Sequence, residues 1–144
     1  MINLLRNVLA IFIGLFLGGV VNMAIITISP RVIPPPAGVD VAKVESMQAS
    51  MHLFEAKHFL FPFLAHALGA FVGALLAFVA AGSRRAVLAY TVSTLFLAGG
   101  ITACFLLPAP AWFMALDLIG AYLPMAWLGT RVGRRFTASA PTAS

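Results

Sequence analysis

The chain has 144 residues, of which 62% are hydrophobic and 9% are charged, and its formal net charge is +5. A water-soluble domain of this size cannot bury so many apolar side chains, because much of any small fold stays on its surface. The basic residues flank apolar runs instead of forming a patch, which argues against nucleic acid as a partner and leaves the lipid bilayer.

Four apolar segments predict four transmembrane helices. They cover residues 6–29, 59–82, 86–107 and 111–132, and each has the length of about 20 residues that crosses the hydrocarbon. Helices are expected because an open chain in lipid must pair its backbone N–H and C=O groups within each segment. We therefore expect an all-α four-helix bundle over residues 1–135 and a disordered Ala/Ser/Thr/Pro-rich tail at 136–144.

The long loop at residues 30–58 is the only sizeable part outside these helices. Its first half contains the run Pro34-Pro35-Pro36, which cannot be helix interior. Its second half has apolar residues at helical spacing: Val41, Val44, Met47, Met51 and Phe54. This pattern predicts a short extracytoplasmic amphipathic helix that lies on the outer leaflet or caps the bundle.

The distribution of basic residues orients the bundle. One side of the predicted membrane carries Arg6, Arg84, Arg85, Arg131, Arg134 and Arg135, and the other carries Arg31, Lys43 and Lys57. Because cytoplasmic loops are richer in Lys and Arg, we expect both termini in the cytoplasm and the 30–58 loop outside.

Small residues recur at intervals of four in three of the predicted helices. These GxxxG-type faces are Gly14, Gly18 and Asn22; Ala65, Gly69, Gly73 and Ala77; and Gly129 and Gly133. Such faces allow close backbone approach between membrane helices. They are explained by packing inside the bundle or by dimerisation, and the sequence leaves both open.

Each of the four helices also carries one polar residue at a similar depth. Asn22, His66, Thr102 and Asp117 all lie about 5–8 residues inside the outer helix ends, or roughly 8–12 Å at helical rise. His66 is the only intramembrane base available to Asp117, so the two are expected to pair, with Asn22 and Thr102 completing the hydrogen bonds.

A kink is expected next to this cluster. Pro124 cannot donate a hydrogen bond to the Gly120 carbonyl, so the fourth helix should bend close to Asp117. An acid beside a bent helix is a plausible site for a proton or a small cation. The alternative is a structural lock, in which a satisfied polar network only fixes the register of the bundle.

A second group of candidate residues precedes the second membrane helix. On a continuous helix, His52, Glu55 and His58 would lie within a third of the circumference, which allows joint metal binding. The alternative is a belt of polar residues at the membrane interface. No cofactor is identified by the sequence, and a haem between facing helices would need a second intramembrane histidine besides His66.

Four stretches carry a resemblance to a known family: residues 32–40, 50–59, 61–69 and 117–122. They resemble small four-helix bacterial inner-membrane proteins, and the resemblance covers most of residues 10–130. It implies a location in the bacterial inner membrane and brings no activity with it.

Three functions are consistent with these patterns. The first expectation is a non-enzymatic accessory or interaction protein whose outer loop meets a protein partner, because no catalytic motif is present. The alternative is a proton-coupled or small-solute binding or transport protein that uses Asp117 and His66. It would act as a homo-oligomer, since four helices leave little room for a pore. The second alternative is a metal-binding protein or enzyme built on His52, Glu55 and His58 at the outer surface.

Overall fold

The chain forms an all-helical bundle with four spans that are long and apolar enough to cross a membrane. The computed structural model describes residues 2–138, and every element in that range is a helix. The spans are Ile2–Val32, Ala56–Ala80, Arg85–Leu106 and Ala111–Thr137. The prediction of a four-helix, multi-pass membrane protein is therefore confirmed.

The first three spans begin and end close to the predicted residues. Helix α1 covers Ile2–Val32, α3 covers Leu60–Ala80 and α4 covers Arg85–Leu106. The largest difference is in α1, which is 31 residues long and continues through Pro30. At 1.5 Å per residue it is about 46 Å long, so it extends beyond the hydrocarbon layer.

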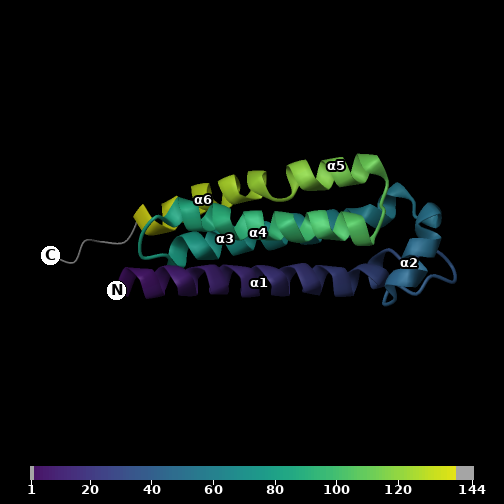
Figure 1. The fold of residues 1–144 in the computed structure, drawn as a ribbon, viewed down its shortest axis with the longest axis horizontal. Coiled ribbons are helices and arrows are strands. Elements are labelled where there is room, and N and C mark those ends of the chain that lie inside the picture. Colours follow the sequence, from purple (N-terminus) through teal and green to yellow (C-terminus); the bar gives the residue numbers. More distant parts are fainter. Residues whose placement is uncertain (1, 139–144) are drawn as a thin grey trace.

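The fourth span consists of two helices, α5 (Ala111–Gly120) and α6 (Leu123–Ala138). The break between them is visible in Figure 1. Helix α6 continues to Ala138, so residues 136–138 are helical and do not belong to a disordered tail. The rest of the predicted tail, 139–144, lies outside the described residues.

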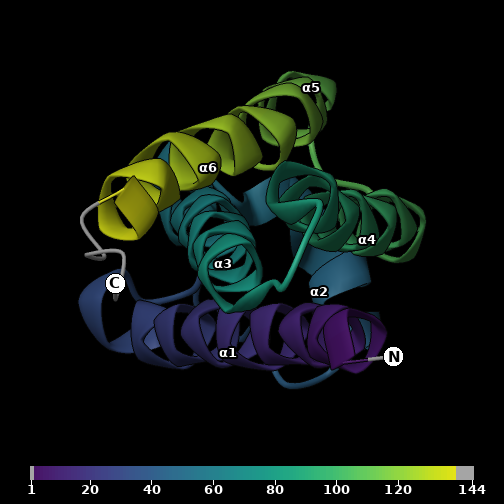
Figure 2. The same cartoon turned by 90° about the vertical axis from the view of Figure 1, so that its left-hand side faces the viewer.

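Helix α3 forms the centre of the bundle. Viewed along the bundle, α3 lies between α1 and α6, with α4 beside it (Figure 2). Its buried positions are almost all small: Ala65, Ala67, Gly69, Ala70, Gly73, Ala74 and Ala77, with Phe78 as the exception. Small side chains let three neighbouring helices approach one backbone closely, which is how membrane helices gain contact without a hydrophobic driving force.

The small-residue faces of α1 and α3 lie against each other. A Cβ atom built on Gly14 would lie 2.6 Å from the carbonyl oxygen of Gly73, and one on Gly18 would lie 2.6 Å from that of Gly69. Gly129 of α6 is similarly close to the Phe71 carbonyl oxygen on α3, at 3.0 Å. These glycine faces are thus used within one copy of the chain, and they hold α1 and α6 on α3.

The segment between α1 and α3, residues 33–59, is called the outer segment, and it is less helical than its periodicity predicts. The expected amphipathic helix from Val41 is a seven-residue helix, α2 (Val44–Ser50), followed by two short 3₁₀ turns, Met51–Leu53 and Ala56–Phe59. The Asp40 carboxylate accepts a hydrogen bond from the Ala42 N–H, which holds a turn where the helix was expected to start. Figure 1 shows this segment at the end of the bundle opposite the start of α1.

The outer segment is attached to the bundle by one polar contact and a group of aromatic rings. The Gln48 amide donates to the Leu106 carbonyl oxygen at the C-terminal end of α4, at 2.5 Å. Phe59 packs on Trp112 and Phe113, with ring centroids 5.7 and 4.7 Å apart. This end of the bundle is therefore covered by the chain itself.

Replacing Gln48 by Ala should loosen α2 without unfolding the bundle. The exposed hydrogen bond to Leu106 is worth about 1 kcal/mol, because water competes for the carbonyl when the amide is removed. We expect faster hydrogen exchange in α2 and in the last turn of α4, and an unchanged rate in α3. Exchange as slow as in the wild type throughout α2 would show that the aromatic contacts alone hold the segment.

Candidate functional site

Two ionisable side chains from different spans touch each other inside the bundle. The Nδ1 atom of His66 on α3 lies 2.9 Å from each carboxylate oxygen of Asp117 on α5. The Asp117 side chain is only 4% exposed, and that of His66 is 23% exposed. A carboxylate this deeply buried needs donors nearby, and His66 is one of them.

The second donor is Tyr122, which the sequence analysis did not include in the cluster. Its hydroxyl donates to Asp117 Oδ2 at 3.1 Å, and the residue is 1% exposed. Its ring also stacks on that of His66, with centroids 5.8 Å apart and an interplanar angle of 29°. The site is therefore a triad of Asp117, His66 and Tyr122.

The break between α5 and α6 brings Tyr122 to Asp117. In a continuous helix, residues five apart point about 140° away from each other. Here α5 ends at Gly120 and α6 begins at Leu123, so Tyr122 lies in the break and turns back toward the carboxylate. Pro124, in the first turn of α6, has no N–H for the Gly120 carbonyl, which explains why the helix is interrupted here.

Gly100 of α4 makes room for the tyrosine. A Cβ atom at this position would overlap the Tyr122 phenol, lying 2.6 Å from its Cζ atom. Helix α4 can therefore approach the triad only because it has no side chain at this point.

The geometry of the triad indicates where its protons lie. Tyr122 donates to Oδ2, and Nδ1 of His66 is equally close to both oxygens, so Asp117 accepts from two sides. This arrangement fits an ionised carboxylate and a proton on Nδ1. In the neutral imidazole, Nε2 then carries a lone pair and can accept a proton.

A pocket of about 380 Å³ lies beside the triad. Its lining is drawn from α1, α3, α4 and the α5–α6 break: Leu15, Asn22, His66, Leu95, Phe96, Gly99, Gly100 and Tyr122. His66 and Tyr122 of the triad are among its lining residues, and Asp117 is not. A molecule in this space can therefore contact the triad without displacing Asp117.

The two other residues of the predicted polar layer have different places. Asn22 lines the same pocket as His66, and its amide has no hydrogen-bond partner within residues 2–138. Thr102 lies outside the cluster, because its hydroxyl donates to the Ala98 carbonyl of its own helix at 2.9 Å and the residue is exposed. A threonine in a helix can satisfy itself in this way and needs no partner helix.

The outer residues His52, Glu55 and His58 do not form a metal site. Within the described part of the chain, no three His, Cys, Asp or Glu side chains are close enough to share a metal ion. The expectation assumed a continuous helix, but Phe54 and Glu55 are extended and separate two short turns. In addition, Nδ1 of His58 accepts a hydrogen bond from the Glu55 N–H at 2.9 Å.

Glu55 instead pairs with a lysine. Lys57 Nζ lies 3.0 Å from Glu55 Oε2. The hydrogen bond from Lys57, together with its positive charge, lowers the pKa of Glu55 below its usual value of 4.5. A lowered pKa stabilises the folded chain at neutral pH, and this contribution is lost as the pH falls below 4.5 through the pKa of the folded state.

Replacing Lys57 by Ala should return the pKa of Glu55 toward its usual value. Lys43→Ala is the matched control, because Lys43 pairs with Asp40, 3.4 Å away, and not with Glu55. The measurement is an NMR titration of the Glu55 carboxyl carbon. An unchanged midpoint in Lys57→Ala would mean that the ion pair does not persist in solution.

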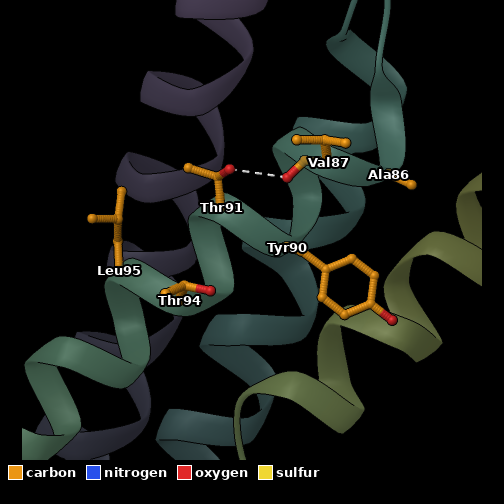
Figure 3. A pocket seen from close by; sticks show the side chains of 6 residues that line it. All are labelled: Ala86, Val87, Tyr90, Thr91, Thr94 and Leu95. Carbon is orange, nitrogen blue, oxygen red and sulfur yellow. Dashed lines mark hydrogen bonds between the residues drawn. The ribbon is translucent and has the colours of Figure 1, made fainter.

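A larger pocket, of about 510 Å³, lies on α4; it contains no residue of the triad and shares only Leu95 with the pocket beside the triad. Its six lining residues all belong to α4, as Figure 3 shows: Ala86, Val87, Tyr90, Thr91, Thr94 and Leu95. The Thr91 hydroxyl donates to the Val87 carbonyl of the same helix. This pocket is a depression along one helix, and no charged group lines it.

Comparisons with known proteins give no match: no family model matches the chain, and no curated protein or solved structure is significantly similar to it.

Proposed function

We propose that this chain is a proton-exchanging membrane protein that binds a small solute beside the triad of Asp117, His66 and Tyr122. One observation carries this proposal. A buried acid, a base and a phenol from two different spans touch one another at the wall of a pocket. Placing an ionisable side chain within a membrane span costs free energy, so a group of such side chains is a candidate functional site by default.

The triad is suited to moving one proton at a defined atom. Asp117 orients the His66 ring through Nδ1, which leaves Nε2 as the proton acceptor. When Nε2 takes a proton, the ring becomes an imidazolium, and the neighbouring Asp117 carboxylate balances its charge. Tyr122 holds the carboxylate in place through Oδ2. Loss of the proton from Nε2 restores the starting state, so binding of a solute that gives or takes a proton there would be coupled to proton movement.

The location and orientation are part of the same proposal. The start of α1 and the end of α6 lie at one end of the bundle (Figure 1). The six arginines named above lie near the start of α1, at the connection between α3 and α4, and in the last part of α6, which are the parts of the chain at this end of the bundle. None of the four acidic residues lies in these parts of the chain. The positive-inside rule favours a cytoplasmic position for this end. The inner membrane of a bacterium is the location that the resemblance to small four-helix bacterial membrane proteins implies.

The accessory role expected first from the sequence has weaker support. That role needed the outer loop to be free for a protein partner, but Gln48 and Phe59 attach this segment to α4 and α5. Transport across the whole membrane would still need a homo-oligomer or a partner subunit, because four helices leave little room for a pore.

The proposal can be tested with protein in lipid vesicles that hold a pH-sensitive dye. After a pH step outside, wild-type vesicles should equilibrate faster than empty ones, and Asp117→Asn should reduce the rate to that of empty vesicles. Thr102→Ala is the matched control, since Thr102 comes from the same depth but bonds only within its own helix. An Asp117→Asn rate equal to that of the wild type, or a wild type no faster than empty vesicles, would contradict proton exchange.

A further inference from the structure

The pocket beside the triad has both polar and apolar walls. Leu15, Leu95 and Phe96 provide apolar surface from α1 and α4. The polar groups are the Asn22 amide and the His66 ring, whose Nε2 has no hydrogen-bond partner among residues 2–138. Unpaired polar groups in a membrane span favour a ligand that hydrogen-bonds to them.

One side of this pocket opens toward the region that lipid occupies. Leu95 is 47% exposed, and a Cβ atom built on Gly99 would meet nothing within 4 Å. Both residues belong to the middle part of α4, a candidate membrane span. Helix α1 packs mainly on α3 and much less on α4, so the contact between α1 and α4 is limited. A ligand can therefore reach His66 sideways from the bilayer.

The charges near the pocket restrict the head group of such a ligand. Asp117 is the only acid in the spans, and none of the residues that line the pocket is a lysine or an arginine. A carboxylate or phosphate head would meet a negative charge with no permanent cation to offset it. A hydroxyl fits better, because its O–H can donate to Nε2 of His66 and its oxygen can accept from the Asn22 amide.

The depth of the site also suits a molecule dissolved in the membrane. His66 is six residues after the start of α3, which is about 9 Å along the helix axis. The α3 helix together with the preceding turn is 25 residues long, more than is needed to cross the hydrocarbon. His66 therefore lies in the outer part of the hydrocarbon layer, where the hydroxyl of a lipid-soluble molecule can reach it.

We propose that the pocket binds a lipid-soluble amphiphile with a neutral hydroxyl head, which enters between α1 and α4 and bonds to His66 Nε2 and Asn22. This inference rests on the proposed function, since it names the class of solute for the same site. The apolar body of the ligand lies along Leu15, Leu95 and Phe96, and its tail extends past Gly99 into the bilayer.

The test uses a long-chain alcohol with a photoreactive diazirine in its chain, added to vesicles that contain the full-length protein. After illumination, mass spectrometry should find the label on residues that line the pocket. Excess unlabelled alcohol should remove the label, and the carboxylic acid of the same chain length should not.

A matched pair of substitutions tests the route of entry. Gly99→Leu places a side chain in the open space at the mouth of the pocket and should reduce labelling about tenfold, the effect of losing about 1.4 kcal/mol of binding free energy. Ala98→Leu adds a similar side chain at the neighbouring exposed residue, which does not line the pocket, and should leave labelling unchanged.

The possible failures are distinguishable. Labelling spread evenly over the lipid-facing helices, equal competition by the acid, or unchanged labelling in Gly99→Leu would overturn the proposed ligand class. If protons still exchange at the triad in that case, the proposed function survives. If the pocket is labelled as expected but Asp117→Asn exchanges protons like the wild type, the proposed function fails and the binding site stands.

Discussion

Replacing Gly18 by Ala should destabilise the bundle, because the added methyl group has no room between α1 and α3. The new Cβ atom would lie 2.6 Å from the Gly69 carbonyl oxygen and 2.9 Å from the Phe96 ring. The ring can shift, but the carbonyl belongs to the backbone of α3, so α1 has to move away. Overpacking of this kind costs about 1–3 kcal/mol, and here it also separates the two helices with the most extensive contact.

Gly19→Ala is the matched control for this prediction. It makes the same chemical change one residue further along, where a Cβ atom would meet nothing within 4 Å. Thermal unfolding in detergent should show a clearly lower midpoint for Gly18→Ala and a midpoint for Gly19→Ala equal to or above that of the wild type. Equal midpoints for the two variants would mean that α1 and α3 are not packed through their glycines.

Substitutions in the triad should destabilise the protein in a defined order. Tyr122→Phe removes one donor and leaves no buried group without a partner, so it should cost about 1 kcal/mol. Asp117→Ala leaves the Nδ1–H of His66 and the buried Tyr122 hydroxyl without an acceptor, and breaking a buried pair costs about 3–5 kcal/mol. Asp117→Asn keeps one acceptor oxygen and should lie between these two.

This order also separates a functional site from a structural lock. Unfolding midpoints give the stability, and the rate of proton movement in vesicles gives the activity at equal amounts of folded protein. A functional site predicts that Asp117→Asn loses proton exchange while most of the protein remains folded. If the variants instead lose proton exchange only in proportion to the loss of folded protein, the triad acts as a lock on the bundle.

The membrane fold could be predicted from the sequence because hydropathy and length determine it almost alone. Four runs of about 20 apolar residues leave few alternatives to four spanning helices. The outer segment was harder to predict, since periodicity can suggest a helix but cannot show where a turn interrupts it. There, the Asp40 side chain and the extended backbone at Glu55 limit the helix to Val44–Ser50.

The contact between His66 and Asp117 could be anticipated because Asp117 is the only acid in the four spans and His66 is the only histidine well inside one. Tyr122 was missed for a geometric reason. Residues 117 and 122 point to different faces of a regular helix, and only the break after Gly120 brings them together. Pro124 gave the signal for that break, so a search on both sides of the expected kink would have found the tyrosine.

Depth alone was a poor guide to the rest of the polar layer. Thr102 has the expected depth, but it faces outward and bonds to its own helix. Asn22 has both the depth and the face, and it reaches the pocket without reaching the carboxylate. Which polar residues meet depends on the rotation of each helix about its axis, and hydropathy does not determine that rotation.

The most direct test of the proton-exchange site is nitrogen-15 NMR of His66 in protein labelled at its histidines and embedded in lipid. His52→Gln and His58→Gln together leave His66 as the only labelled ring. We expect a proton on Nδ1 and reversible protonation of Nε2 in the wild type, with the Nδ1 proton left without its acceptor in Asp117→Ala. A ring protonated only on Nε2, or a spectrum that does not change with pH, would contradict the account.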